Sequence, residues 1–366
     1  MSIICILGGL GYIGSHIALI FLKNNIEVLL IDNFSNSDII VFNNLQSKYK
    51  NVIFRSCDIN DKELLGNILS SYNINTVIYA FRDSFTNNTY MANYEICNKL
   101  LSIFEGIDYS NKINGNRINK LIFASNIDIY TSQKGLHLED DEFNIVHPYS
   151  FLICLKEKMI SDYYTFRKHI SIIILRLTIP VGGDSIFYDM YNNKNYIINN
   201  PGLQNNLLGH YLYDTRFNIY GCKYNTIDGS NNINLLSIYD ICMAFWRAHI
   251  FLDSQSRIFK TYNIANNSTL TIIQFIKLLT IYNNKNLIEK SIRFYILNVP
   301  NLKISNKTYS IEKAEKELNW RPFRSILIDM SELIYHTKKQ QSNNVLYLNN
   351  DVFYPQNEYI ILESGD

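Results

Sequence analysis

Four glycines follow the first apolar run of the chain, in the segment GGLGYIG. Gly8, Gly11 and Gly14 have the spacing at which glycine lets a backbone turn tightly and approach a pyrophosphate held by helix N-terminal amides. The backbone groups of Tyr12 and Ile13 belong to the same turn. The segment therefore predicts a phosphate-binding turn for a dinucleotide.

The second apolar run ends in Asp32, in the segment IDNFSNS. An acidic residue about 20 positions after such a turn accepts the adenosine ribose hydroxyls and favours NAD over NADP. Asn33, Asn36 and Ser37 follow in the same loop, so we assign them to the cofactor site as well. A glycine-rich turn followed by a solvated aspartate is the structural alternative.

Short apolar runs alternate with helical periodicity around these motifs. Because the runs are apolar on both faces, they predict an α/β fold with a doubly wound parallel sheet covered by helices. The expected strands are 3–7, 28–31, 52–55, 76–79, 120–124 and 171–175. The expected helices are 15–23, 61–72, 94–104 and 148–164.

The alternation breaks after Pro180, which suggests a domain boundary. We expect a cofactor domain at 1–180, a smaller α/β substrate domain at 181–340 and a loosely attached tail at 341–366. Asn-rich and Tyr-rich sequence predicts loops over 188–223, and 310–318 is the clearest late helix.

The composition excludes several classes of partner. With 34 Lys and Arg against 33 Asp and Glu, the chain has no overall field to attract nucleic acid or an anionic membrane. The six cysteines are scattered singly and predict reduced thiols and no metal site. No apolar run reaches the roughly 20 residues of a membrane span, and no basic segment precedes a signal-peptide core, so we expect a cytoplasmic protein.

Four segments carry a more specific resemblance. GGLGYIGSH, IDNFSNS, TIDGS (226–230) and KELNWRP (316–322) resemble segments of UDP-galactose (UDP-glucose) 4-epimerases, which are extended short-chain dehydrogenases/reductases. The similarity covers residues 3–330 and implies a Rossmann fold, bound NAD, a UDP-sugar substrate and a homodimer. It also implies that Asp58 and Ile59 contact the adenine end of the cofactor and that Asn93 belongs to the cofactor site.

The resemblance implies a catalytic tyrosine in a YxxxK motif and a serine or threonine upstream. Tyr149 occupies the tyrosine position, but Ile153 replaces the lysine. Lys156 lies seven residues after Tyr149, about 10 Å away along the helix axis. Asn126 occupies the serine position, while Ser125 is expected to point elsewhere. An asparagine can hydrogen-bond a sugar hydroxyl but cannot relay a proton.

A literal YxxxK motif spans Tyr164 to Lys168. It lies just before the strand at 171–175 and therefore at the end of the helix remote from the cofactor edge. We interpret it as a solvated pair at a helix terminus, and we expect no catalytic role for it.

The expected sugar-nucleotide contacts are partly replaced. Asn206 and Leu207 match the family's uridine-nucleotide pair. Ile179 replaces an expected asparagine, Ile233 replaces an arginine for the diphosphate, and a second arginine is lost near Pro300. We expect the nearby cations Lys223 and Lys303 to compensate in part.

Three functions fit these residues. The first is interconversion of UDP-galactose and UDP-glucose with Tyr149 as the base. The second is an NAD-binding, catalytically impaired relative that acts as a sensor or structural partner. The third is a different reaction on another nucleotide-sugar, because a fold alone does not fix chemistry.

Overall fold

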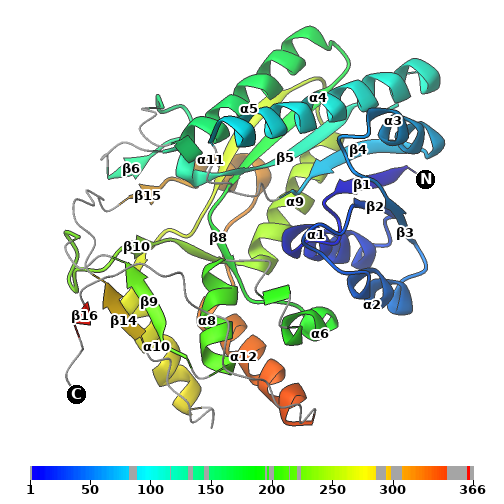
Figure 1. Cartoon of the computed structure of the whole chain (residues 1–366). Helices are drawn as coiled ribbons and strands as arrows, with labels where there is room; N and C mark the ends of the chain where they lie inside the picture. The colour runs from blue at the N-terminus through cyan, green and yellow to red at the C-terminus, as the bar shows by residue number, and fades with distance from the viewer. Residues whose placement is uncertain are drawn as a thin grey trace.

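The computed structural model describes residues 2–81, 89–115, 117–130, 135–143, 148–193, 196–197, 202–213, 215–220, 224–285, 294–297, 307–343 and 361–362. Within them, one seven-stranded sheet has the order β12-β7-β5-β4-β1-β2-β3 (Figure 1). Its neighbouring strands are all parallel. The strands are β1 (Ile3–Leu7), β2 (Val28–Asp32), β3 (Val52–Ser56), β4 (Ile74–Tyr79), β5 (Lys120–Asn126), β7 (Ser171–Leu177) and β12 (Phe259–Ile264).

The central strands are apolar on both faces, as a sheet covered by two helical layers requires. Every residue of β1, β2 and β7 is buried. The six strands expected from sequence are all present, with bounds extended by a few residues at most. The predicted doubly wound parallel sheet is therefore confirmed.

Helices cover both faces of the sheet. One core packs α1 (Tyr12–Lys23) and α9 (Ile238–Asp253) against it, with Phe21 and Phe245 fully buried. The other core packs α3 (Lys62–Ser71), α4 (Thr89–Asn114) and α5 (Pro148–Phe166) on the opposite face. Figure 1 shows these two layers on either side of the strands, with α2 (Ile40–Lys48) beside β3.

The edge strand β12 comes from late in the chain. It pairs in parallel with β7, from Phe259 opposite Ile172 to Ile264 opposite Leu177. Helix α9 precedes it and packs against α1. The large sheet thus draws on sequence from both sides of residue 180.

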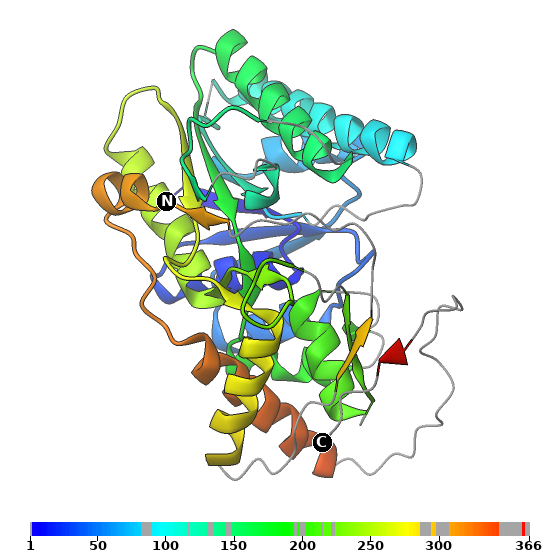
Figure 2. The same cartoon turned by 90° about the vertical axis from the view of Figure 1, so that its left-hand side faces the viewer.

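The remaining elements form small sheets and helices, most of them beyond the carboxyl edge of the large sheet and in the lower part of Figure 2. Strand β8 (Ile179–Val181) pairs with β11 (Leu235–Ser237), and β10 (Asn232–Ile233) pairs with β13 (Leu270–Thr271). β14 (Phe294–Leu297) lies between β9 (Phe217–Tyr220) and β16 (Ile361–Leu362), and β6 (Leu136–His137) pairs with β15 (Thr308–Tyr309). The helices are α6 (Tyr188–Asn192), α8 (Leu203–Leu212), α10 (Ile272–Lys285), α11 (Glu312–Leu318) and α12 (Ile326–Asn343).

The expectation of loops over 188–223 is wrong for much of that range, because α6, α8 and β9 lie within it. Its tyrosines supply core: Tyr191 is fully buried and Tyr211 is 2% exposed. The late helix α11 begins at Glu312, close to its expected start. Most of the expected tail at 341–366 lies outside the described residues.

The described residues place further limits on chemistry. Their five cysteines are free thiols, and Cys222 lies outside the described part. Across the same residues, no group of three or more His, Cys, Asp or Glu side chains is arranged to hold a metal ion. No helix in the described part of the chain has the length and apolar character needed to cross a membrane.

Candidate active site at the carboxyl edge of the sheet

The glycine turn connects β1 directly to α1. Gly8 has a φ of +77°, which a side chain disfavours, and a Cβ there would lie 3.0 Å from the Phe81 ring. A Cβ at Gly14 would overlap the carbonyl oxygen of Gly8. The backbone of α1 therefore packs against the turn as only glycine permits, and the unpaired first-turn amides of Tyr12 and Ile13 can donate to a phosphate.

Asp32 joins this turn to the loop after β2. Its carboxylate accepts hydrogen bonds from the Leu10 amide at 3.0 Å, the Phe34 amide at 3.0 Å and the Ser37 hydroxyl at 2.7 Å. The side chain is 3% exposed. Since each carboxylate oxygen has two lone pairs, Asp32 keeps acceptor capacity while its position is fixed.

The loop after β3 lies beside the loop after β2. Asn33 donates from Nδ2 to the Asp58 carboxylate at 3.2 Å, so these two expected cofactor residues are in contact. Asn36 is half-buried in the same loop, whereas the Ile59 side chain is 4% exposed and belongs to the core. Asn93 lies on α4, but its side chain is outside the described residues. The turn, Asp32 and Asp58 together fit a dinucleotide at this edge.

Asn126 and Tyr149 lie together at the carboxyl end of β5. The Asn126 Oδ1 accepts from the Asp128 amide at 2.7 Å, which caps a short 3-10 helix, Ile127–Ile129. Its Nδ2 donates to the Tyr149 hydroxyl oxygen at 3.1 Å. Tyr149 is in the first turn of α5 and is half-buried. A donor to the phenol oxygen favours the phenolate form that a tyrosine base requires.

The side chain that replaces the expected lysine and the lysine three residues later both face the core. Ile153 is 1% exposed and packs within the core on the α1 side of the sheet. Lys156 is 7% exposed, and its Nζ lies 5.8 Å from the centroid of the Phe123 ring on β5. The Lys156 ammonium is thus held against the sheet by a cation–π contact.

A buried ionic network explains why Ser125 is turned away from Tyr149. The Ser125 hydroxyl donates to Glu157 Oε1 at 2.5 Å, and Arg176 donates to Glu157 Oε2 at 2.8 Å. Arg176 also donates to the Tyr130 hydroxyl at 2.6 Å. Burial disfavours the Arg176 charge, but hydrogen bonds and charge from Glu157 outweigh it and raise the pKa of Arg176. This network anchors β5, α5 and β7 to one another beneath Asn126.

The alternative YxxxK pair is remote from this arrangement. Tyr164 lies fifteen residues after Tyr149 on α5, roughly 22 Å along the axis. The Arg257 guanidinium stacks 3.8 Å from its ring centroid, and Phe259 packs beside it. Its neighbours give Tyr164 a structural role at the end of the helix.

On the expected substrate side, Asn206 is exposed on α8. Leu207 is fully buried in the core, so it can contact a ligand only through its backbone. Ile179 on β8 and Ile233 on β10 are half-buried. Positions 223, 300 and 303 lie outside the described residues.

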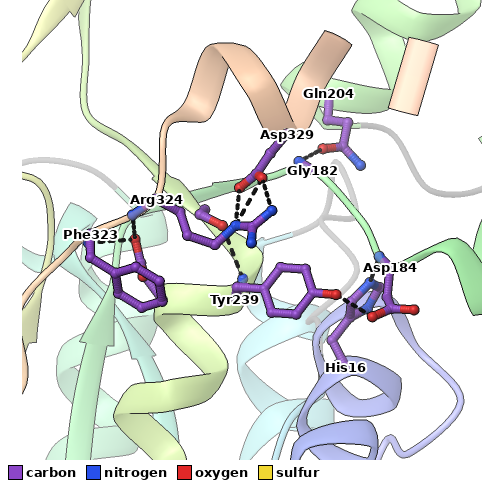
Figure 3. Close-up of polar contacts among 10 residues, drawn as sticks. His16, Gly182, Asp184, Gln204, Tyr239, Phe323, Arg324 and Asp329 are labelled. Atoms are coloured by element: carbon purple, nitrogen blue, oxygen red, sulfur yellow. Dashed lines mark hydrogen bonds and ion pairs between the residues drawn. The ribbon is translucent and has the colours of Figure 1, made fainter. Parts of the chain in front are cut away.

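Sequence reasoning missed a polar network that ties α1 to the segment after β8 (Figure 3). The Tyr12 hydroxyl donates to the Gly182 carbonyl at 2.7 Å, and Gln204 Oε1 accepts from the Gly182 amide at 2.5 Å. The His16 ring bonds the Tyr12 carbonyl at 2.7 Å through Nδ1 and accepts from the Asp184 amide at 3.0 Å through Nε2. Burial lowers the pKa of His16 to about 4. The signal available in sequence was a histidine on an otherwise apolar helix face.

The Asp184 carboxylate extends this network toward α9. It accepts hydrogen bonds from Tyr239, from Lys23 at 3.0 Å and from the Ile186 amide at 3.1 Å. Burial raises the pKa of Asp184, but these donors outweigh burial and hold it below its usual value. Arg324 stacks 4.5 Å from the centroid of the Tyr239 ring.

The KELNWRP segment docks the late chain onto α9. Trp320 donates from its indole nitrogen to the Asp240 carbonyl at 2.8 Å. The Asp240 carboxylate accepts from the Phe323 and Arg324 amides, each at 3.1 Å. Arg324 in turn pairs with Asp329 of α12 at 2.6 Å (Figure 3). The motif that resembled the epimerases therefore has a structural role.

Known proteins resemble this chain over most of its length. The sequence profile of the NAD dependent epimerase/dehydratase family matches residues 4–265. A UDP-glucose 4-epimerase of Yersinia enterocolitica is 27% identical over 366 residues, covering 94% of this chain and 99% of that protein. One from Dictyostelium discoideum is 24% identical over 327 residues, covering 87% and 90%.

Solved structures share the fold. UDP-glucose 4-epimerase from Bifidobacterium longum, in complex with NAD+ and UDP, has a TM-score of 0.76 at 20% identity and covers 94% of this chain and 100% of that one. UDP-glucuronic acid 4-epimerase from Bacillus cereus, in complex with UDP-glucuronic acid and NAD, has a TM-score of 0.69 at 21% identity and covers 93% and 100%.

Proposed function

The chain belongs to the NAD dependent epimerase/dehydratase family, and from this premise we propose that it interconverts UDP-galactose and UDP-glucose. The observation that carries the proposal is the Asn126–Tyr149 hydrogen bond at the carboxyl end of β5. It places a phenol and a polar amide at the edge of the sheet where the glycine turn and Asp32 also lie. Ligands bind at this edge in open parallel sheets.

The cofactor of this family is NAD, which when bound supplies the reversible redox chemistry at the sugar carbon. We assign its pyrophosphate to the amides of Tyr12 and Ile13, after the Gly8, Gly11 and Gly14 turn. Its adenosine ribose is assigned to Asp32, with Asn33, Asn36 and Ser37 around it. Asp58, Ile59 and Asn93 complete the proposed cofactor site.

Tyr149 is the proposed base that takes the proton from the sugar hydroxyl. For this it must ionise, and a free phenol with a pKa near 10 is ionised in only about one molecule in a thousand at pH 7. The Asn126 amide stabilises the phenolate by donating to its oxygen. Asn126 can also orient the sugar hydroxyl, but it carries no transferable proton.

Asn206 and the Leu207 backbone are the proposed contacts for the uridine nucleotide. Asn206 is exposed on α8, on a helix whose Leu207 and Leu208 side chains are fixed in the core. The helix therefore presents Asn206 from a rigid base. This side lies after the proposed boundary near residue 180, beyond which α9 and β12 return to the large sheet.

A second candidate is an NAD-binding relative with impaired catalysis. The observation that favours it is Ile153, which is buried where the family's motif has a lysine. A neutral side chain at this position removes the ammonium that would lower the Tyr149 pKa. A different nucleotide-sugar is the third candidate, because Ile179 and Ile233 alter the proposed substrate side.

One experiment separates these functions. Purified protein is incubated with UDP-galactose, and UDP-glucose is detected by a coupled dehydrogenase, while NAD binding is titrated by calorimetry. Turnover that requires Tyr149 supports the epimerase. NAD binding without turnover of UDP-galactose, UDP-N-acetylgalactosamine or UDP-glucuronic acid supports the impaired relative.

We also propose a homodimer through the outer face of α4 and α5, which pack together. Large apolar side chains are exposed there: Leu101, Tyr109 and Ile113 on α4, and Phe151 and Phe166 on α5. Exposed apolar side chains on two adjacent helices suit a symmetric interface. Light scattering of purified protein tests it, and a monomer at tens of micromolar would contradict it.

A further inference from the structure

Gly182 lies where the proposed cofactor and substrate elements meet. Its carbonyl accepts from the Tyr12 hydroxyl, and its amide donates to Gln204 Oε1. Tyr12 is the first residue of α1, and Gln204 is in the first turn of α8. One peptide segment thus connects the helix assigned to the pyrophosphate with the helix that carries Asn206.

The hydrogen bonds close into a small, partly buried ring. Besides binding Gly182, Gln204 Oε1 accepts from the Tyr12 hydroxyl at 3.3 Å, so Tyr12 and Gln204 also touch directly. Gln204 is 4% exposed. Burial raises the pKa of Tyr12 well above its usual value, so its hydroxyl keeps its proton and remains the donor.

The surroundings hold this ring in one arrangement. Gly182 has a φ of +94°, and a Cβ there would lie 2.7 Å from Asp329 Cβ, so the segment is packed against α12. The Tyr12 ring packs edge-on to Tyr191 and to His16, with centroids 6.2 and 5.2 Å apart. Because this packing is tight, a shift of α1 or α8 must disturb the ring of hydrogen bonds.

We propose that Gln204, through Tyr12 and Gly182, is a positioning residue that couples binding of the dinucleotide to binding of the nucleotide-sugar. The proposal rests on the function proposed above for α1 and α8. Gln204 reaches the proposed pyrophosphate site through the Tyr12 side chain, and it lies two residues before Asn206 in α8. It sets the position of α8, and so of Asn206, relative to the amides of α1. Ordering of α1 by the dinucleotide then orders α8, and the reverse holds by thermodynamic reciprocity.

The test is a pair of titrations of the full chain with NAD, without UDP and with saturating UDP, by calorimetry. For the unsubstituted protein we expect UDP to tighten NAD binding by at least about fivefold, the lower end of usual coupling. In Tyr12→Phe and Gln204→Met, we expect the ratio of the two dissociation constants to fall below about twofold. Tyr12→Phe removes a single oxygen atom, so it tests the ring even if Gln204→Met fails to fold.

Two further variants distinguish coupling from ordinary stability. Gln204→Glu keeps an acceptor for Gly182 and Tyr12, and we expect it to retain the ratio. Gln255→Leu, at an exposed site after α9, is the matched control and should also retain it. A purely structural role would lower stability or both affinities in Tyr12→Phe and Gln204→Met and leave the ratio unchanged, which would overturn the proposal.

The same titrations separate failure of this inference from failure of the proposed function. If unsubstituted protein binds both NAD and UDP but binds each equally well with or without the other, the coupling is absent while the proposed function stands. If it binds neither, the proposed function fails and the coupling fails with it.

Discussion

Asn126 donates a hydrogen bond from its Nδ2 to the Tyr149 hydroxyl oxygen at 3.1 Å, across the gap between the end of β5 and the start of α5. The same amide group is fixed from its other side, because Asn126 Oδ1 accepts from the Asp128 amide. The orientation of the asparagine is therefore set by the backbone. A fixed hydrogen-bond donor therefore faces the phenol oxygen before any ligand binds.

The first prediction concerns the proposed base. Tyr149→Phe should lower epimerase turnover by about 10²- to 10⁴-fold, the usual worth of general base catalysis. Tyr164→Phe should change turnover by less than about twofold, because its partners are Arg257 and Phe259 at the far end of α5. Initial rates with UDP-galactose measure both. Greater damage from Tyr164→Phe would show that the assignment of Tyr149 is wrong.

The second prediction concerns the missing ammonium. Ile153→Lys should raise turnover or shift the pH optimum downward, because a cation one helical turn from Tyr149 lowers the phenol pKa. It should also lower the free energy of unfolding, because Ile153 is 1% exposed and a buried lysine loses its hydration. The measurements are a pH–rate profile and urea unfolding.

Ile153→Met is the uncharged control for that change, since it keeps a similar volume. It should leave the pH optimum where it is. If folded Ile153→Lys binds NAD yet shows the rate and pH profile of Ile153→Met, the charge is not what limits the site, and the impaired-relative function gains support.

The third prediction concerns cofactor choice. The chain should bind NAD at least about tenfold more tightly than NADP, because a 2′-phosphate would lie against the buried Asp32 carboxylate. Asp32→Asn should reduce that preference, since it removes the like charge and keeps an acceptor. Parallel calorimetric titrations with both dinucleotides give the ratio. Equal or better affinity for NADP in the unsubstituted chain would contradict the assignment of Asp32.

The fourth prediction concerns pH and stability. The pKa of His16 falls to about 4 in the folded chain, below its ordinary 6.5, because burial disfavours the charged ring. The folded state therefore binds fewer protons than the unfolded state. The stability due to neutral His16 is complete above pH 6.5 and is lost as the pH falls toward 4.

At pH 5 the free energy of unfolding should be lower by roughly 2 kcal/mol than at pH 7.5 because of His16. Urea unfolding at several pH values measures it. His16→Gln should make the free energy of unfolding vary less between pH 7.5 and pH 5. His336→Gln, at an exposed position on α12, should leave that variation unchanged. An unchanged slope in His16→Gln would show that another group titrates in this range.

The sheet and the central pair of the site were predictable because their signals are local. Runs of Ile, Val and Leu mark the buried parallel strands, and the spacing of Tyr149 after Pro148 placed the phenol at the start of a helix. The proximity of Asn126 to Tyr149 follows from the carboxyl end of β5 and the first turn of α5 lying side by side.

Long-range contacts had no such signal. The bonds of Gly182 to Tyr12 and Gln204 join residues 170 and 22 positions apart, and no periodicity reports them. Tyrosines over 188–223 resembled loop sequence, but Tyr191 and Tyr211 fill core, because a tyrosine ring is apolar enough to be buried when it packs well. Packing against distant residues determines that these tyrosines lie in the core, and local composition does not report such packing.

The late position of β12 has a consequence for synthesis of the protein. On a ribosome, β7 is complete at Leu177, but its partner β12 is added only at 259–264. Until then β7 presents a bare, apolar edge to which another strand can attach. A nascent chain, or a fragment truncated before residue 259, should therefore depend on chaperones and aggregate without them, and ribosome-bound chains should gain protease resistance only after β12 has left the exit tunnel.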